Sequence, residues 1–201
     1  MQSLQAVRSL LLITAITVAT MSNAHGAKLG APLLIAALQQ GGYVLYLRHA
    51  KTSRSSADQL PIDFNSCDRQ RNLSNAGRLQ AKTIAATFRK FRVSFSVAVS
   101  SPYCRCLETA KLIVGDTVHA EAGLAHAIAQ SREVRAAGRR RLQSLLSQRV
   151  QTGNRLIVGH TSNLQEAAGI WPEEEGEAWV FRPLGDGGYE SLGRLRAYAL
   201  K

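Results

Sequence analysis

The chain has 201 residues, of which 45% are hydrophobic and 19% are charged, a composition typical of a globular protein and unlike that of a disordered or fibrous one. This length allows one domain with a sizeable core, or at most two small ones. The net charge of +11, from 25 Lys and Arg residues against 14 Asp and Glu residues, favours either anionic partners or a solvated basic surface. Because the basic residues are scattered and lack interleaved aromatic residues, they do not predict a site for single-stranded nucleic acid.

The N-terminal residues have the pattern of an export signal. Arg8 is followed by the apolar run SLLLITAITVAT, and the small residues Ser22 and Ala24 suit cleavage by signal peptidase. The run is shorter than the roughly 20 apolar residues of a membrane span. We therefore predict a signal peptide over residues 1–24 and one domain over residues 25–201, with no stable membrane span after cleavage. An uncleaved N-terminal anchor is the alternative.

The next segments predict a helix, a strand, a long loop and a second helix. A short helix is expected over residues 31–40 and an apolar strand over 43–47. Residues 50–72 are polar and rich in turn residues, which predicts a loop of the length that usually serves a function. Ser74 caps the second helix, and its apolar residues recur with helical spacing at Ala81, Ile84, Ala85 and Phe88.

The middle of the chain predicts a buried strand over residues 96–100. Ser101-Pro102 follows it, and Ser as an N-cap before Pro is typical of a helix start, here extending to about Val114. An extended segment is expected over 118–124. Ser131 then begins a basic helix whose inner face carries Leu142, Leu145 and Leu146.

The last third predicts another apolar strand over residues 155–159, which ends at His160. Ser162 and Gln165 form a capping box for a short helix. Two more strands are expected over 178–182 and 189–199. Because strands and helices alternate, we predict an α/β fold with three α/β/α layers and a mostly parallel central sheet.

The three cysteines leave several pairings open. In an oxidising compartment Cys67 can pair with Cys104 or with Cys106, and we favour the Cys67–Cys104 disulfide. Three reduced, partly buried thiols are the alternative. The Cys and His residues have no zinc-like spacing, so no metal site is predicted.

Basic side chains follow three of the predicted strands. Arg48 and His49 follow the first strand, Arg105 lies in the first turn of the helix after the second, and His160 ends the third. Taken singly, Arg105 suits a solvated helix surface and His160 suits a core. Because ligands of such sheets bind beyond the carboxyl ends of the strands, however, all four are expected on one edge. Two arginines, two histidines and a helix N-terminus there predict a phosphoryl-binding site.

Four motifs along the chain carry a family resemblance. They are Arg48-His49-Ala50 with Thr52, Leu73-Ser74 with Gly77, Ser101-Pro102 with Arg105 and Thr109-Ala110, and Gly159-His160. In this order and on these elements, they resemble the motifs of the histidine phosphatase (phosphoglycerate mutase-like) superfamily, in particular its small exported members. The resemblance covers about residues 43 to 165.

The resemblance implies roles for these residues. His49 is expected to be the nucleophile that becomes phosphorylated, with Arg48, Arg105 and His160 completing the catalytic set. The same three residues and Thr52 are expected to bind phosphate, and neither a metal nor an organic cofactor is expected. The two arginines should keep His49 neutral, which nucleophilic attack requires. Lys51 and Arg54 either extend the anion site or face solvent.

The proton donor is left open. The family often has a glutamate in the segment that reads GLAHAIAQ here, and His126 stands near that position. His126 and Glu177 are therefore candidate donors, and Asp58 and Asp63 in the long loop are other candidates. Substrates whose leaving groups need little protonation are the alternative.

These observations predict an exported, metal-independent phosphomonoesterase in the periplasm or outside the cell. Its expected partner is a phosphorylated small molecule or glycan, such as a sugar phosphate or the phosphorylated heptose of lipopolysaccharide core, and not a nucleic acid. Export argues against glycolytic mutase and protein-phosphohistidine phosphatase activities. A weakly catalytic or non-catalytic binder of phosphorylated glycans is the rival interpretation, motivated by the missing glutamate.

Overall fold

The computed structural model describes residues 28–55 and 57–200. The expected signal peptide over residues 1–24, its cleavage site and the start of the mature chain near His25 lie outside the described residues. Within the described part of the chain, no helix has the length and apolar character that crossing a membrane requires.

A central sheet of six strands runs in the order β3-β2-β4-β1-β5-β6. β1, β2, β3 and β4 run parallel to one another, whereas β5 is antiparallel to both of its neighbours, β1 and β6. The mostly parallel sheet expected from the sequence is therefore confirmed. The strands are β1 (Val44–Arg48), β2 (Phe95–Ser100), β3 (His119–Ala120), β4 (Asn154–Gly159), β5 (Ala178–Gly185) and β6 (Gly188–Leu195).

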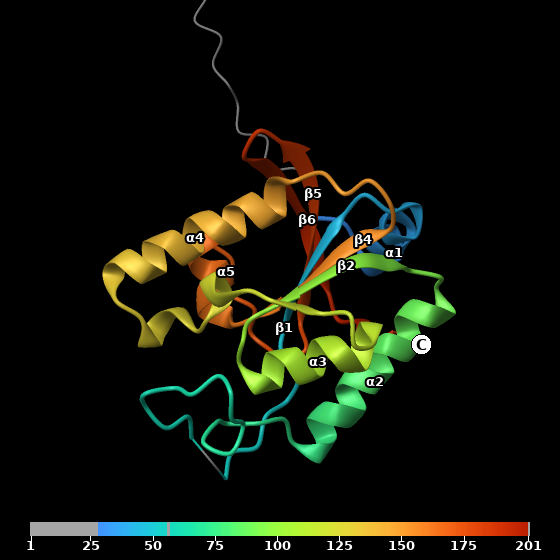
Figure 1. Cartoon of the computed structure of the whole chain (residues 1–201). Helices are drawn as coiled ribbons and strands as arrows, with labels where there is room; N and C mark the ends of the chain where they lie inside the picture. The colour runs from blue at the N-terminus through green and yellow to red at the C-terminus, as the bar shows by residue number, and fades with distance from the viewer. Residues whose placement is uncertain (1–27, 56, 201) are drawn as a thin grey trace, which may run out of the picture.

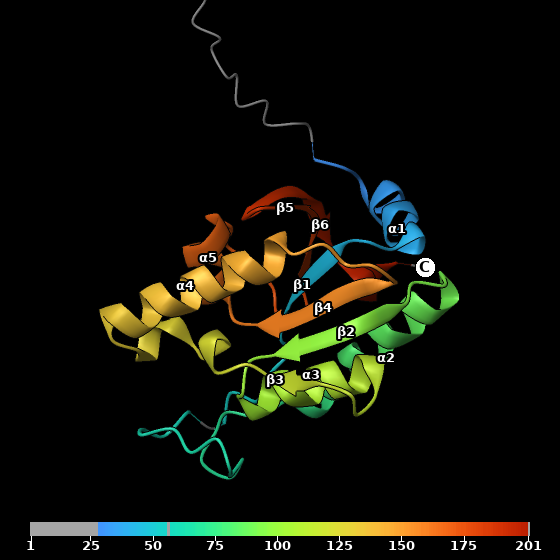
Figure 2. The same ribbon diagram turned by 45° about the horizontal axis from the view of Figure 1, so that its top comes forward.

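Helices cover both faces of this sheet, as Figure 1 and the tilted view in Figure 2 show. One face packs against α1 (Ala31–Gln40), α2 (Asn75–Lys90) and α3 (Cys104–Val114). The other packs against α4 (Arg132–Ser147) and α5 (Thr161–Ala168). Consecutive residues of β1 alternate between the two cores, as a fully buried strand requires. The three-layer fold is confirmed.

The parallel strands end together at one edge of the sheet. Arg48 at the end of β1 pairs with Gly159 at the end of β4, and Ser100 at the end of β2 pairs with Val158. The residues that follow these ends, among them His49 and His160, are therefore brought together although they are distant in sequence.

A glycine is required at position 77, near the start of α2, because the Lys51 backbone approaches closely there. The Ser74 side chain caps this helix by accepting a hydrogen bond from the Gly77 amide. A Cβ atom on Gly77 would lie 1.8 Å from the carbonyl oxygen of Lys51. Glycine at this position thus lets α2 pack directly against the segment that follows His49.

Two predicted helix starts were wrong. α3 begins at Cys104 and not at Pro102, because the Ser101 amide still bonds to Val158 of β4. α5 begins at Thr161 directly after β4, so Ser162 lies inside the helix and cannot cap it.

Two extended segments are also shorter than predicted. The one expected over residues 118–124 forms only the two-residue strand β3, followed by a 3-10 turn over Ala122–Leu124. The last strand ends at Leu195, because a 3-10 turn at Ala197–Ala199 takes the chain out of the sheet.

Candidate active site

His49 follows β1 and is 2% exposed. Its Nδ1 atom lies 2.9 Å from the carbonyl oxygen of Ala50. A carbonyl oxygen only accepts hydrogen bonds, so Nδ1 carries the proton of the neutral ring. The lone pair of Nε2 is then free to form a bond.

Burial keeps His49 neutral. Removal from water is the main cause that holds its pKa well below the usual 6.5, and the guanidinium of Arg105 is the next. Arg48 and Arg71 act in the same direction, while the hydrogen bond to Ala50 opposes them. The expectation that arginines help to keep His49 unprotonated agrees with these shifts.

His160 and His126 lie beside His49. The ring centres of His49 and His160 are 5.4 Å apart, and those of His160 and His126 are 4.8 Å apart. Burial lowers the pKa of both His160 and His126, and the positive charge of Arg105 adds to the effect. Three neutral imidazoles therefore share one site.

The hydrogen bonds of His160 indicate which of its nitrogens is protonated. Its Nε2 lies 2.9 Å from Oγ of Ser101, and that oxygen accepts a hydrogen bond from the amide of Tyr103. The Ser101 hydroxyl can therefore donate its proton to Nε2, and in the tautomer that accepts this bond the ring proton is on Nδ1.

The two predicted arginines reach the site from different elements. Nη1 of Arg48 donates to the carbonyl oxygens of Pro172 and Glu173, at 3.2 and 2.8 Å. Arg105 is 1% exposed, its guanidinium lies 4.3 Å from the ring centre of Tyr103, and its Nη1 donates to Asp58 at 2.9 Å. Both guanidiniums are thereby held in fixed orientations.

Three polar atoms at the site are buried without a hydrogen-bond partner in the described residues. They are Nε of Arg48, Nε of Arg105 and Nδ1 of His160. Buried polar atoms in folded proteins are nearly always paired. Three such atoms, two of them on cations, match the acceptor-rich surface of an oxyanion such as a phosphoryl group.

Thr52 is buried near His49, but its hydroxyl is already engaged. It donates to Glu175 Oε1 at 2.6 Å, while the Thr52 amide is 3.3 Å from Oε2. Glu175 Oε1 is also 3.9 Å from Nδ1 of His49. Thr52 must therefore leave Glu175 before it can donate to a phosphate, so its predicted role as a phosphate ligand stays a prediction.

The two candidate proton donors lie in different surroundings. His126 belongs to the histidine cluster, as its contact with His160 shows. Glu177 is 1% exposed, accepts a hydrogen bond from Trp179 Nε1 at 3.0 Å, and lies 3.8 Å from both Arg194 and Arg196. The structure brings His126 to the site and gives Glu177 other partners.

The long loop between β1 and α2 makes contacts with Arg105 that were not predicted from the sequence. Asp58 pairs with Arg105, and the carbonyl oxygen of Arg71 accepts from the same guanidinium. A disulfide joins Cys67 to Cys104 at the start of α3, next to Arg105. The favoured cysteine pairing is thus confirmed, and Cys106 is buried as a free thiol whose pKa burial raises to about 12.

Gln70 and Glu175 were also missed. Gln70 accepts a hydrogen bond from the Cys104 amide, so it caps α3 in place of the predicted Ser101. The run Glu173-Glu174-Glu175 was the only sequence signal for Glu175, and an acidic run is more often solvated. Both residues act through contacts with segments far away in sequence.

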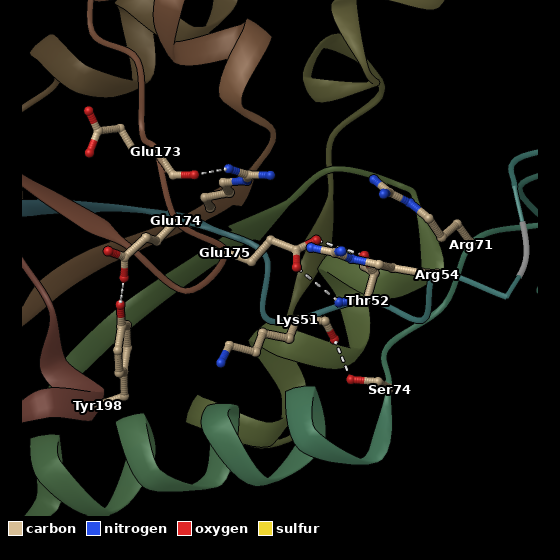
Figure 3. Close-up of a pocket in the computed structure, with 10 residues that line it drawn as sticks. Lys51, Thr52, Arg54, Arg71, Ser74, Glu173, Glu174, Glu175 and Tyr198 are labelled. Carbon is tan, nitrogen blue, oxygen red and sulfur yellow. Dashed lines mark hydrogen bonds between the residues drawn. The ribbon is translucent and has the colours of Figure 1, made fainter.

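A cleft of about 660 Å³, whose lining side chains Figure 3 shows, adjoins the histidine site through Glu175, which lies 3.9 Å from His49. Arg48 and Thr52 belong to both the histidine site and the cleft. Its volume suits a small-molecule ligand. The remaining lining residues are Lys51, Arg54, Arg71, Ser74, Glu173, Glu174, Glu175 and Tyr198.

In the described part of the chain, no three or more His, Cys, Asp or Glu side chains are grouped so that they could bind a metal ion. The side chains that gather at the site are cationic or neutral donors, apart from Asp58 and Glu175, which are already paired. This donor set suits an anion better than a cation.

Comparison with known proteins shows which family model and which solved structures this chain resembles. The model of the histidine phosphatase superfamily (branch 1) matches residues 44–133, which contain three of the four motifs. No curated protein matches the chain by sequence.

Solved structures share the fold at low sequence identity. The protein histidine phosphatase SixA in complex with tungstate has a TM-score of 0.57 and 14% identity, covering 79% of this chain and 99% of that one. A putative phosphohistidine phosphatase SixA from Agrobacterium tumefaciens has a TM-score of 0.52 and 17% identity, covering 77% and 97%. A variant of the phosphoserine phosphatase from Entamoeba histolytica, in complex with phosphoserine, has a TM-score of 0.51 and 14% identity, covering 79% and 99%.

Proposed function

The chain has the histidine phosphatase fold and matches that superfamily's model, and on this premise we propose that it hydrolyses phosphate monoesters through a phosphohistidine on His49. One observation carries the proposal. A buried, neutral His49 with its proton held on Nδ1 lies among two arginines and His160, whose unpaired polar atoms suit a phosphoryl group.

The first step transfers the phosphoryl group to His49. Nε2 attacks phosphorus, the new P–N bond forms, and the P–O bond to the alcohol breaks. Arg48 and Arg105 offer charge-assisted hydrogen bonds to the nonbridging oxygens, and Nδ1–H of His160 adds another donor. Phosphoryl transfer depends mainly on such positioning and charge stabilisation, so these residues need no metal for the step.

The second step returns the enzyme to its starting state. Water attacks the phosphorus of phosphohistidine, the P–N bond breaks, and orthophosphate leaves. His49 is again a neutral imidazole with a free Nε2. Dividing hydrolysis into two displacements is covalent catalysis.

His126 is the proton donor that we favour for the leaving oxygen. In the free protein its pKa is lowered, so the ring is neutral. A bound phosphate dianion adds negative charge near the ring and raises that pKa. The substrate therefore creates the protonated form of His126 that its own leaving group needs. Glu177 would have to exchange its bond to Trp179 for this role.

We place this activity in the periplasm or outside the cell. The apolar leader supports export, and the Cys67–Cys104 disulfide supports an oxidising compartment, where disulfides persist. The polar cleft beside His49 supports a hydrophilic ester such as a sugar phosphate or the phosphorylated heptose of lipopolysaccharide core.

Hydrolysis of an aryl phosphate by the purified protein, with chelator present, tests this function. Activity that survives the chelator and disappears in His49→Ala is the expected result. An active wild type whose activity the chelator removes would contradict metal independence. No hydrolysis by a wild-type protein that still binds phosphate would favour the phosphoglycan binder, since an aryl leaving group hardly needs a proton donor.

A further inference from the structure

The cleft beside His49 contains three cationic side chains besides Arg48. Lys51 and Arg54 follow β1, and Arg71 precedes α2, so all three belong to the loop segment between these elements (Figure 3). None of the three forms an ion pair within 4.0 Å among the described residues. Their positive charge is therefore available to a ligand.

The carboxylates of the same cleft are already engaged. Glu173 lies 3.7 Å from Arg194, and Glu174 lies 2.7 Å from Arg196 and accepts a hydrogen bond from Tyr198. Glu175 accepts two hydrogen bonds from Thr52. Glu173 and Glu174 are thus paired with arginines from outside the cleft, and Glu175 is held by Thr52, whereas Lys51, Arg54 and Arg71 have no ionic partner among the described residues.

This imbalance makes the cleft attractive to anions beyond the phosphoryl site. The N-terminus of α2 lies on the basic side, because its capping residue Ser74 also lines the cleft, and it adds to the positive potential. The positive charge of Arg71 also lowers the pKa of His49, so Arg71 lies close enough to interact electrostatically with the proposed nucleophile. The cationic wall is therefore near enough to act on the same ligand.

We propose that Lys51, Arg54 and Arg71 bind a second anionic group, a phosphate or a carboxylate, on the alcohol part of the phosphomonoester. The substrate is then a small molecule with two anionic groups, one transferred to His49 and one retained in the product. This inference rests on the proposed phosphatase function and specifies the substrate class of that site.

Three alkyl phosphates with the same reacting ester test the inference. They are 3-hydroxypropyl phosphate, 3-phosphonooxypropanoate and propane-1,3-diyl bisphosphate. The measured quantity is kcat/KM for phosphate release from each. We expect the two compounds with a second anionic group to exceed the hydroxyl compound by about tenfold or more, the gain of one well-placed charge contact near a protein surface. The better of the two identifies the second group as carboxylate or phosphate.

Two variants separate charge recognition from shape. In Arg54→Gln and in Lys51→Gln the preference for the compounds with a second anionic group should fall severalfold. Lys82→Gln removes the same charge from an exposed site on α2 outside the cleft and should leave the preference intact. The preference should also weaken as salt is raised, because exposed charges are screened.

The outcomes distinguish this inference from the proposed function. Equal kcat/KM for all three compounds in a protein that hydrolyses aryl phosphate in a His49-dependent way would overturn the second-anion site alone. A preference that Arg54→Gln and Lys51→Gln leave unchanged would overturn it as well. Loss of His49-dependent hydrolysis for every compound would instead overturn the phosphatase function.

Discussion

His126 is the residue whose role the sequence left most open, and its surroundings make that role testable. Because burial and Arg105 lower its pKa, the proposed role as proton donor requires that a phosphate ester first raises that pKa. We predict that His126→Gln lowers kcat/KM for an alkyl phosphate about 100-fold, the usual contribution of a general acid. An aryl phosphate, whose leaving group needs little protonation, should be much less affected.

Comparing the effect of His126→Gln on alkyl and on aryl phosphates also controls for a general disturbance of the site. A variant that merely disturbs the histidine cluster would slow alkyl and aryl phosphates alike. Equal losses for both would therefore contradict the assignment of His126 as the donor and return attention to Asp58 and Glu177.

The positions of single site residues were predictable from the sequence where the residue directly follows a buried parallel strand. His49 and His160 directly follow buried parallel strands, so the rule that ligands bind at strand ends located them. Glu175 was not predictable, because its partner Thr52 is distant in sequence and nothing local marks the contact. The same holds for Asp58, which meets Arg105 only because the long loop folds back.

At the level of elements, the start of α2 is tied to the segment after His49 through Gly77. Gly77→Ala would normally stabilise a helix by about 1 kcal/mol. Here the added Cβ would lie 1.8 Å from the Lys51 carbonyl oxygen, so something must move. We predict a loss of about 2 kcal/mol or more in the free energy of unfolding, with reduced kcat/KM.

Urea denaturation and steady-state kinetics measure these two effects. Ala76→Gly, which is exposed in the same helical turn, serves as the control and should cost about 1 kcal/mol with no change in kcat/KM. A Gly77→Ala protein that is more stable than wild type would show that α2 does not pack against Lys51 as described.

The disulfide connects the long loop to the start of α3. Cys67 and Cys104 are 37 residues apart in sequence. By the chain-entropy argument, we predict that the double variant Cys67→Ser, Cys104→Ser loses about 4 kcal/mol in the free energy of unfolding. It should also lose activity, because the loop that carries Asp58 and Arg71 meets Arg105 beside this link.

Reductant provides the matched comparison. Reducing the wild type should reproduce the stability of the double variant, and reductant should not change the variant itself. A wild type that is equally stable with and without reductant would contradict a structural disulfide.

Elements with a clear internal pattern were predictable, and those that depend on neighbours were not. α1 has the predicted bounds, and α4 begins one residue after Ser131, its predicted cap, because their apolar spacing and caps are local. α3 starts later than predicted because Gln70, from the loop, caps it. The extended segment expected over 118–124 contains only the two-residue strand β3. It pairs with β2 at two positions, and the 3-10 turn at Ala122–Leu124 then takes the chain away from the sheet.

For the whole molecule, two buried histidines, His49 and His160, and the half-buried His126 predict how stability depends on pH. The folded pKa values of His49, His126 and His160 are lowered, so below about pH 6.5 the unfolded chain binds protons that the folded chain does not. The free energy of unfolding should therefore fall as the pH drops below about 6.5. Each histidine contributes up to about 1.4 kcal/mol per pH unit.

Urea denaturation at several pH values between 7 and 5 measures this slope. His126→Gln should reduce it, while His119→Gln, at an exposed position on β3, should not. A stability that stays constant over this range would contradict the burial of neutral imidazoles at the site.

The central claim is that His49 carries the phosphoryl group during turnover, and trapping that group tests it most directly. The protein is mixed with an aryl phosphate, quenched in alkali, where phosphohistidine persists, and digested for mass spectrometry. We predict a phosphoryl group on the peptide that contains His49, on a time scale that matches turnover, and none in His49→Ala. A protein that turns over without phosphorylating His49, or that carries the group on Ser101 or His160, would contradict this account.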